Sequence, residues 1–393
     1  MRMNGEALKA QLERVQRTAL AVGAAGLVVC ALGFFTAREQ FFQSYLLGFV
    51  FWMCIAMGSF AVLLLHHTFG AGWGFVVQRP LEAATRTFPL MAVLFLPLLA
   101  GMHDLYHWTH AEAATDVLLK HKAAYLNVPF FIGRTAFYFV AWIGVASLLN
   151  RWSAQLDETG DARIAEKLRA FGPPGLLVYG LTATFAAVDW VMSLDPHWFS
   201  TMFGLIFISG QVLATFAFMI LVTRVLSKHE PMKDRAHPAQ FHDLGNLTLA
   251  FTMIWAYLSF SQFLIIWSGN LPETITWYTD RSRGGWQWVA LLLFVLNFAL
   301  PFALLLSRFT KRRIDALARV AIIILAMRLV DLFWVIAPKF HAEAFHVHWL
   351  DVAAPAGIGG AWVWFFLNEL KKRPVLPVRD PRMEEALAHA EEH

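Results

Sequence analysis

Four charged residues lie inside long apolar stretches of the chain: Arg134, Asp189, Arg328 and Asp331. A charge inside a lipid bilayer costs roughly 2.5 kcal/mol or more, so such residues usually pair with one another or line a wet path. Three of them, Asp189, Arg134 and Asp331, lie about five or six residues from the end of their stretch, roughly 8–9 Å at the rise of an α-helix. Arg328 lies one turn deeper. The spacing predicts one polar layer below one face of a membrane.

Further polar residues could extend this layer into a path for protons. They are His66, His67 and Glu82, near the mouth between the second and third apolar stretches, and Gln211, Asn297 and Ser259, at mid-membrane depth. The alternative is that mid-membrane Gln and Asn side chains only bind neighbouring helices, an effect worth about 0.6–2 kcal/mol. Asp189 and Asp331 would complete the route, because carboxylates inside a membrane are costly to keep for packing alone.

The apolar stretches that must position these residues are long enough to cross a membrane. The chain is 58% apolar and only 15% charged, against about 25% charged in an ordinary soluble domain. A span needs about 20 apolar residues. We expect about ten such helices, near residues 18–35, 45–65, 88–102, 128–150, 175–194, 199–223, 244–268, 285–307, 316–337 and 348–367. The predicted fold class is an all-α polytopic membrane protein.

Two pairs of segments indicate an internal repeat. The segments that start at Val188 and Val330 both have Val-Asp followed by a proline, and those that start at Gly48 and Gly204 share two phenylalanine positions. Each pair is separated by an even number of helices, so the repeat would be parallel. It predicts two four-helix bundles, from helices 2–5 (45–194) and 6–9 (199–337), flanked by helix 1 (18–35) and helix 10 (348–367).

The basic residues predict an orientation. Most of the 32 lysines and arginines fall on the side of the membrane that carries the amino terminus, and basic residues resist translocation. We therefore expect residues 1–370 to form a membrane domain with both termini in the cytoplasm, and residues 371–393 to form a cytoplasmic tail. The longest connections expected are 66–87, 103–127, 151–174 and 224–243. The basic residues are spread over these loops, which argues against nucleic acid as a partner.

Cysteine and histidine usage excludes several redox mechanisms. Cys30 and Cys54 stand alone in apolar stretches, so the chain has neither a CxxCH haem attachment nor the cysteines of an iron–sulfur cluster. The 15 histidines fall in loops, tails and helix ends, whereas haem b needs paired histidines on facing helices. We expect no metal and no redox cofactor in this chain, so a partner must handle any electron.

Three segments, 65–84, 188–201 and 242–273, resemble the ActF-type subunits of bacterial alternative complex III, within the NrfD-like family of polysulfide-reductase membrane subunits. The resemblance covers nearly the whole chain. It implies two four-helix bundles flanked by single helices, in a complex of the bacterial inner membrane that oxidises quinol or menaquinol. The implied partners are an ActC-like sister subunit, which carries the main quinol site, an iron–sulfur subunit, multihaem cytochrome c subunits and membrane lipid.

A quinol site on this chain is a further hypothesis. A quinol head group needs a proton acceptor flanked by aromatic walls. His103, Asp104 and His107 supply titratable groups at the end of the third apolar stretch, with Tyr106 and Trp108 beside them. The alternative is that they are solvated loop residues.

Two other functions are compatible with buried charges in a polytopic protein. A stand-alone secondary transporter also buries charges at a repeat interface, but it typically breaks helices near mid-membrane, and most prolines here fall at helix ends. A purely structural anchor for a periplasmic redox arm is the third interpretation. If the chain belongs to the complex that the resemblance implies, we expect it to be a subunit of an oxidoreductase that is not catalytic alone.

Overall fold

The computed structural model describes residues 6–233, 235–377 and 379–383, and every regular element in them is a helix. In these residues nine helices are long and apolar enough to cross a membrane, or ten if one bent pair counts as a single span. The nine spans are α1 (Glu6–Thr36), α2 (Arg38–Phe69), α7 (Val128–Thr159), α8 (Ala162–Trp190), α9 (Phe203–Leu226), α10 (Pro238–Gly269), the helix from α12 (Trp286–Leu293) to α13 (Leu300–Leu306), α15 (Ile314–Ile336) and α16 (Leu350–Leu370). The predicted all-α, multi-span class is confirmed.

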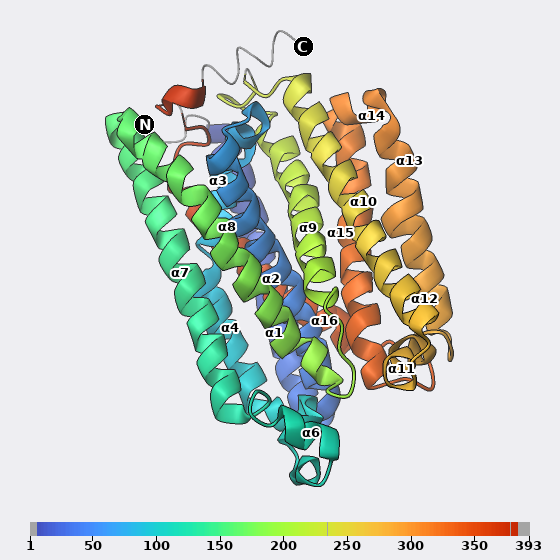
Figure 1. The fold of residues 1–393 in the computed structure, drawn as a ribbon. Coiled ribbons are helices and arrows are strands. Elements are labelled where there is room, and N and C mark those ends of the chain that lie inside the picture. The colour runs from blue at the N-terminus through green and yellow to red at the C-terminus, as the bar shows by residue number, and fades with distance from the viewer. Residues whose placement is uncertain (1–5, 234, 378, 384–393) are drawn as a thin grey trace.

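Shorter helices mark the two ends of the molecule. Figure 1 shows α3 (Gly72–Thr85) and α14 (Arg308–Arg312) at one end, named here the α14 end, and α6 (Val117–Lys122) and α11 (Pro272–Arg281) at the other, the α11 end. The large exposed side chains of Trp267, Trp288 and Trp349 all lie near helix termini at the α11 end. Exposed tryptophans at that position are typical of a membrane–water interface.

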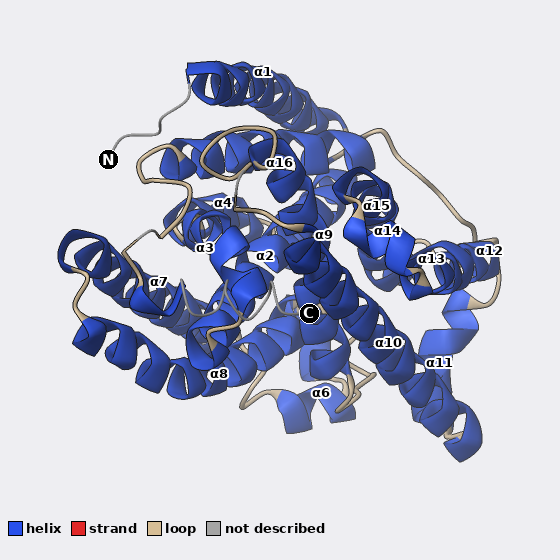
Figure 2. Cartoon of the chain, turned by 90° about the horizontal axis from the view of Figure 1, so that it is seen from above, coloured by secondary structure: helices blue, strands red, loops and turns tan. Residues whose placement is uncertain are grey.

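Helix α2 is the centre of the fold. Of its most apolar window 94% is buried, against 22% for α10. It packs against α3, α8, α9 and α16, and seen from above it lies among them (Figure 2). The close approach to α9 needs Gly58, because a Cβ there would overlap the backbone of Gln211 and the side chain of Thr215. Small residues at such contacts are the usual means of packing helices in lipid.

Helices α1 and α16 pack tightly on one another, and α16 packs on α2. The contact uses small residues on both helices, since a Cβ on Gly26 or Gly360 would overlap the facing backbone. Helix α9 packs on α10 and α15 as well as on α2 and α8. Contacts therefore run across the predicted boundary between helices 2–5 and 6–9, and the division into two bundles stays a prediction.

The third predicted span, 88–102, corresponds to the second helix of a bent pair. Helix α4 (Phe88–Ala100) follows α3, and the two meet at an angle of 42°. The expectation of a connection over 66–87 was wrong, since α2 continues to Phe69 and α3 begins at Gly72. Helix α3 is buried over nearly its whole length, so its polar residues face protein.

The expected loop over 151–174 is also helical. Helix α7 runs on to Thr159 and α8 starts at Ala162. Gly160 ends α7 in the left-handed region with φ 66°, and the Asp161 side chain accepts from the backbone N–H of Arg163 at 2.9 Å, which caps α8. These capping residues make a tight turn beyond the apolar stretches, so both helices extend past the length that the bilayer requires.

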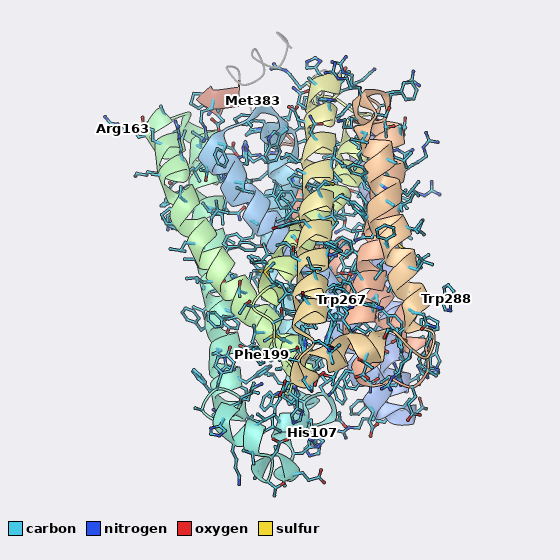
Figure 3. All side chains as sticks on the ribbon, turned by 45° about the vertical axis from the view of Figure 1, so that its right-hand side comes forward. His107, Arg163, Phe199, Trp267, Trp288 and Met383 are labelled. Atoms are coloured by element: carbon cyan, nitrogen blue, oxygen red, sulfur yellow. The ribbon has the colours of Figure 1, made fainter. Side chains whose placement is uncertain are left out.

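The described part of the carboxy-terminal tail folds back on the α14 end. Val375, Leu376 and Met383 are buried, and Figure 3 shows Met383 at the opposite end of the molecule from His107. Residues 384–393 of the predicted tail lie outside the described residues.

Candidate functional site

Asp189, near the end of α8, is fully buried and binds Arg134 of α7 in bidentate fashion. The guanidinium Nε donates to Oδ2 at 2.9 Å and Nη2 donates to Oδ1 at 2.8 Å. The Tyr138 hydroxyl also donates to Oδ2, at 2.7 Å. Arg134 donates to the Tyr125 carbonyl at 2.9 Å and lies 3.7 Å from the centroid of the Tyr125 ring. Both charges are therefore fully engaged, which is the arrangement that makes a buried ion pair tolerable.

The second pair, on α15, is less complete. Arg328 Nη1 donates to Asp331 Oδ2 at 2.7 Å, as expected for residues three apart on one helix. The guanidinium lies against Gly210 of α9, where a Cβ would overlap it, and 5.8 Å from the ring centroid of Trp255. Arg328 Nε is buried without a hydrogen-bond partner. Among the described residues, the one side-chain hydrogen bond of Asp331 is at Oδ2. Asp331 thus keeps an acceptor free.

The four charged residues predicted to form one layer are joined in two separate pairs. Arg134 and Asp189 bridge α7 and α8, whereas Arg328 and Asp331 both belong to α15. Within the described residues, no hydrogen bond or ion pair links one pair to the other. The spacing of three residues on one helix predicts the Arg328–Asp331 pair, whereas the depth of Asp189 in its apolar stretch gives no means to choose Arg134 as its partner.

Glu82 of α3 is the buried carboxylate of the α14 end. Its Oε1 accepts from Ser153 at 2.6 Å and from Gln78 at 3.0 Å, and its Oε2 accepts from Arg79 at 2.8 Å and from Arg373 at 3.3 Å. Sequence reasoning missed these four partners. Gln78 and Arg79 stand four and three residues before Glu82, a spacing that places all three on one helix face. This spacing could have predicted these two partners from the sequence.

His66 and His67 lie beside this network at the end of α2. His66 Nε2 and Gln78 Oε1 are 3.2 Å apart, so His66 joins Glu82 through Gln78. Both histidines are fully buried, and His66 Nδ1 and both ring nitrogens of His67 have no partner. The structure therefore brings His66 and Glu82 together through Gln78 and leaves His67 adjacent without a hydrogen bond, while their role in a proton path stays a prediction. Unpaired buried nitrogens are costly and are suited to an internal water.

The predicted mid-membrane residues have three different environments. Gln211 Oε1 accepts from the Tyr179 hydroxyl at 2.6 Å, a bond between α9 and α8. Asn297 is fully buried in a π-helical turn over Phe294–Ala299, and neither its amide nitrogen nor its oxygen has a partner. Ser259 borders a large cavity. Single π turns occur often at functional sites, which makes Asn297 the most unusual of the three.

The predicted quinol ligands lie on the surface of the α11 end. His103 and His107 are exposed, and Asp104 pairs with the exposed Arg38 at 3.2 Å. The neighbouring Tyr106 is buried and donates to the carbonyl of Trp190 at 3.0 Å, and burial raises the pKa of its hydroxyl. The aromatic residues thus face the protein interior while the titratable groups face outward, so no aromatic walls enclose this cluster, and the quinol assignment here stays a prediction.

A cavity that sequence analysis did not predict lies between α10, α11, α12 and α15. Its volume is about 940 Å³, and its walls are mostly apolar and aromatic. The polar groups on its lining include Asp331, Gln262, Tyr278 and Arg281. Burial raises the pKa of Tyr278 to about 12 and lowers that of Arg281 to about 9, so both side chains stay protonated at neutral pH.

Apolar spans with ion pairs buried among them define the chain as a polytopic helical membrane protein. No group of three or more His, Cys, Asp or Glu side chains in the described ranges is placed to hold a metal ion. The chain matches no protein-family model, and no curated protein sequence matches it.

Proposed function

We propose that the chain is an integral membrane subunit of a quinol-oxidising respiratory or photosynthetic electron-transfer complex. It resembles the ActF-type subunits in three segments, of which the longest, 242–273, forms most of α10 and the start of α11. In this proposal it has no redox cofactor of its own. An ActC-like sister subunit, an iron–sulfur subunit and multihaem cytochrome c subunits bind quinol and carry the electrons.

The placement of basic residues supports the proposed orientation. Arg169, Lys233 and Arg312 belong to segments at the α14 end, and this end carries most of the lysines and arginines. Because basic loops stay in the cytoplasm, the α14 end is the cytoplasmic end in this proposal. The α11 end then faces the periplasm, where the redox partners dock.

The observation that carries a role in proton conduction is the series of buried polar groups along α2. Near its α14 end, His66 contacts Gln78, which binds Glu82. Eight residues earlier, about 12 Å at the helical rise, Gly58 touches Gln211 of α9. Water must carry a proton across the interval between them, and the unpaired nitrogens of His66 and His67 are groups that such water would bind.

From this mid-membrane point the polar series continues on α9. Gln211 accepts from Tyr179, and its neighbour Gly210 lies against Arg328. Arg328 binds Asp331, whose free oxygen borders the cavity near the α11 end. Asp331 keeps one oxygen free for a proton or a water, whereas both oxygens of Asp189 are bound to Arg134.

The complex is tested by gentle solubilisation of the membrane and purification through a tag on this subunit. Iron–sulfur and multihaem cytochrome c proteins should copurify with it in fixed ratio. A tagged protein that elutes alone after mild extraction would refute membership in such a complex.

The anchor interpretation makes a different prediction for the same material. If the chain only holds a periplasmic redox arm, substitution of Asp331 leaves quinol turnover and proton release unchanged in the assembled complex. If the chain is a stand-alone transporter, it purifies alone and moves a solute in vesicles. The break between α3 and α4 does not favour transport, because Arg86 at the break binds Asn150, in the half of α7 nearer the α14 end.

A further inference from the structure

The cavity is a wedge between two diverging helices. Helix α10 packs against α13 and α14 toward the α14 end, but it makes no comparable contact with α12. Helix α12 packs instead against α15, which forms the floor of the wedge, and α11 closes it at the α11 end. In Figure 3, Trp267 and Trp288 mark the α11 ends of α10 and α12 on either side. The opening therefore faces the lipid rather than the water.

The walls are aromatic, and their rings pack on other rings. Trp277 stacks on Trp198 with ring centroids 4.9 Å apart and meets Trp334 edge to face at 5.3 Å. Tyr278 packs edge to face on Phe263 at 5.2 Å. Rings held by other rings lose little entropy when a flat molecule binds between them, and aromatic pairs of this geometry are favourable.

The few polar groups on the lining have unused hydrogen-bonding capacity. Asp331 forms its one side-chain hydrogen bond through Oδ2, which leaves Oδ1 without a partner among the described residues. Gln262 Nε2 donates to the Tyr278 oxygen at 3.3 Å, which leaves the Tyr278 proton free to donate. The cavity thus offers one acceptor, Asp331, and one donor, Tyr278, within apolar walls, a combination typical of small-molecule sites of about 300–1,000 Å³.

We propose that this cavity binds a planar aromatic ring that carries hydroxyl or carbonyl oxygens and an apolar tail. The ring lies between the aromatic walls, with one oxygen at Asp331 and the other at Tyr278, and the tail leaves between α10 and α12 into the lipid. The inference deepens the proposed function, on which it rests for the identity of the natural ligand as a quinol. It places this ligand away from His103, Asp104 and His107.

The competing occupant is the acyl chain of a phospholipid. An acyl chain fills apolar space but forms no hydrogen bonds, so it would leave Asp331 Oδ1 and the Tyr278 hydroxyl proton unpaired among apolar groups, which is costly. A ring with two oxygens satisfies these groups. The two occupants are therefore distinguished by whether binding depends on the polar lining.

The test is a fluorescence titration of the full-length protein in phospholipid nanodiscs with 2-heptyl-4-hydroxyquinoline N-oxide, a fluorescent planar ring with an apolar tail. Ala290→Phe and Ala256→Phe fill the wedge from opposite walls and should each raise the Kd by about tenfold or more. Ala303→Phe, on the exposed face of α13 outside the cavity, is the matched control and should leave the Kd unchanged. Equal Kd values for all three variants would overturn the proposal.

Tyr278→Phe separates the two occupants, because it removes one hydroxyl and no apolar surface. It should raise the Kd by about fivefold or more if a ring oxygen is bound there. An unchanged Kd, together with displacement of the probe by added phospholipid, would assign the cavity to acyl chains. The titration uses this chain alone and therefore tests the cavity separately from the proposed complex. If Ala290→Phe weakens binding, the cavity site is supported even when no partner subunits copurify. If Ala290→Phe leaves the Kd unchanged, the cavity site is refuted even when partner subunits do copurify.

Discussion

The two buried ion pairs should respond differently when both charges are removed. Arg328 and Asp331 have each other as their hydrogen-bond partners, so Arg328→Leu with Asp331→Leu leaves no partner behind. Arg134 and Asp189 also bind the Tyr125 carbonyl and the Tyr138 hydroxyl. Removal of that pair leaves two buried polar groups unpaired, at about 1–3 kcal/mol each.

The single variants set the scale. Asp331→Leu leaves Arg328 buried and without an anion, which should lower the free energy of unfolding by about 3–5 kcal/mol. The double leucine variant on α15 should recover most of this loss, since replacing a whole buried pair by apolar residues is often neutral or stabilising. The double leucine variant of Arg134 and Asp189 should keep a lower free energy of unfolding than wild type, because the Tyr125 carbonyl and the Tyr138 hydroxyl stay buried without a partner.

The measurement is unfolding in mixed micelles with increasing dodecyl sulfate, followed by loss of circular dichroism, on both doubles and all four singles. A double on α15 that is as unstable as Asp331→Leu alone would refute the reasoning, as would equal losses for the two doubles. In the purified complex, the α15 double should also lower the number of protons released per electron. Normal proton release would remove Asp331 from the path.

Other predictions follow from the orientation, the surface cluster and the packing of α2. A reporter that is active only in the cytoplasm should be active when fused after Arg169 and inactive after Arg281, and the reverse pattern would contradict the orientation. His103→Ala should leave the Kd for the ring probe unchanged in the nanodisc titration. If His103→Ala instead lowers quinol oxidation in an assembled complex, the quinol site belongs to the cluster of His103, Asp104 and His107. Gly58→Ala should lower the unfolding midpoint, because its Cβ would overlap α9. Gly144→Ala meets no atom within 4 Å and should be neutral or stabilising by up to about 1 kcal/mol, so equal effects of the two would refute the packing argument.

The spans were predictable because the bilayer sets one length for every helix that crosses it. The sequence could not tell α2 from α10, although one is buried in protein and the other faces lipid. Both surroundings are apolar, so both helices read as continuous apolar runs. For the same reason the wedge beside α10 has no sequence signature, since a wall of Trp and Phe looks like a lipid-facing surface.

Other features depend on groups that come from distant parts of the chain. The depth of Asp189 follows from its place in an apolar run, but its pairing with Arg134 requires the relative rotation of α7 and α8. The π turn at Asn297 and the bend between α3 and α4 are local departures from a regular helix. Each stands beside a proline, Pro301 four residues after Asn297 and Pro89 in the first turn of α4, and a proline removes a backbone donor and disturbs the preceding turn. The predicted helices were regular because the apolar pattern alone does not show such departures.

The contact between Arg373 and Glu82 joins residues 291 positions apart. When Glu82 reaches the membrane during synthesis, most of the protein is still to be made. Arg373, the last cation to join the network around Glu82, is made only after the final span. Until then α3, with a carboxylate and an arginine on its buried face, lacks the segment that covers it. Insertion of this protein therefore ends with a closing step at the α14 end, and a nascent chain truncated before Arg373 should keep Glu82 accessible to water-soluble carboxylate reagents that the finished protein excludes.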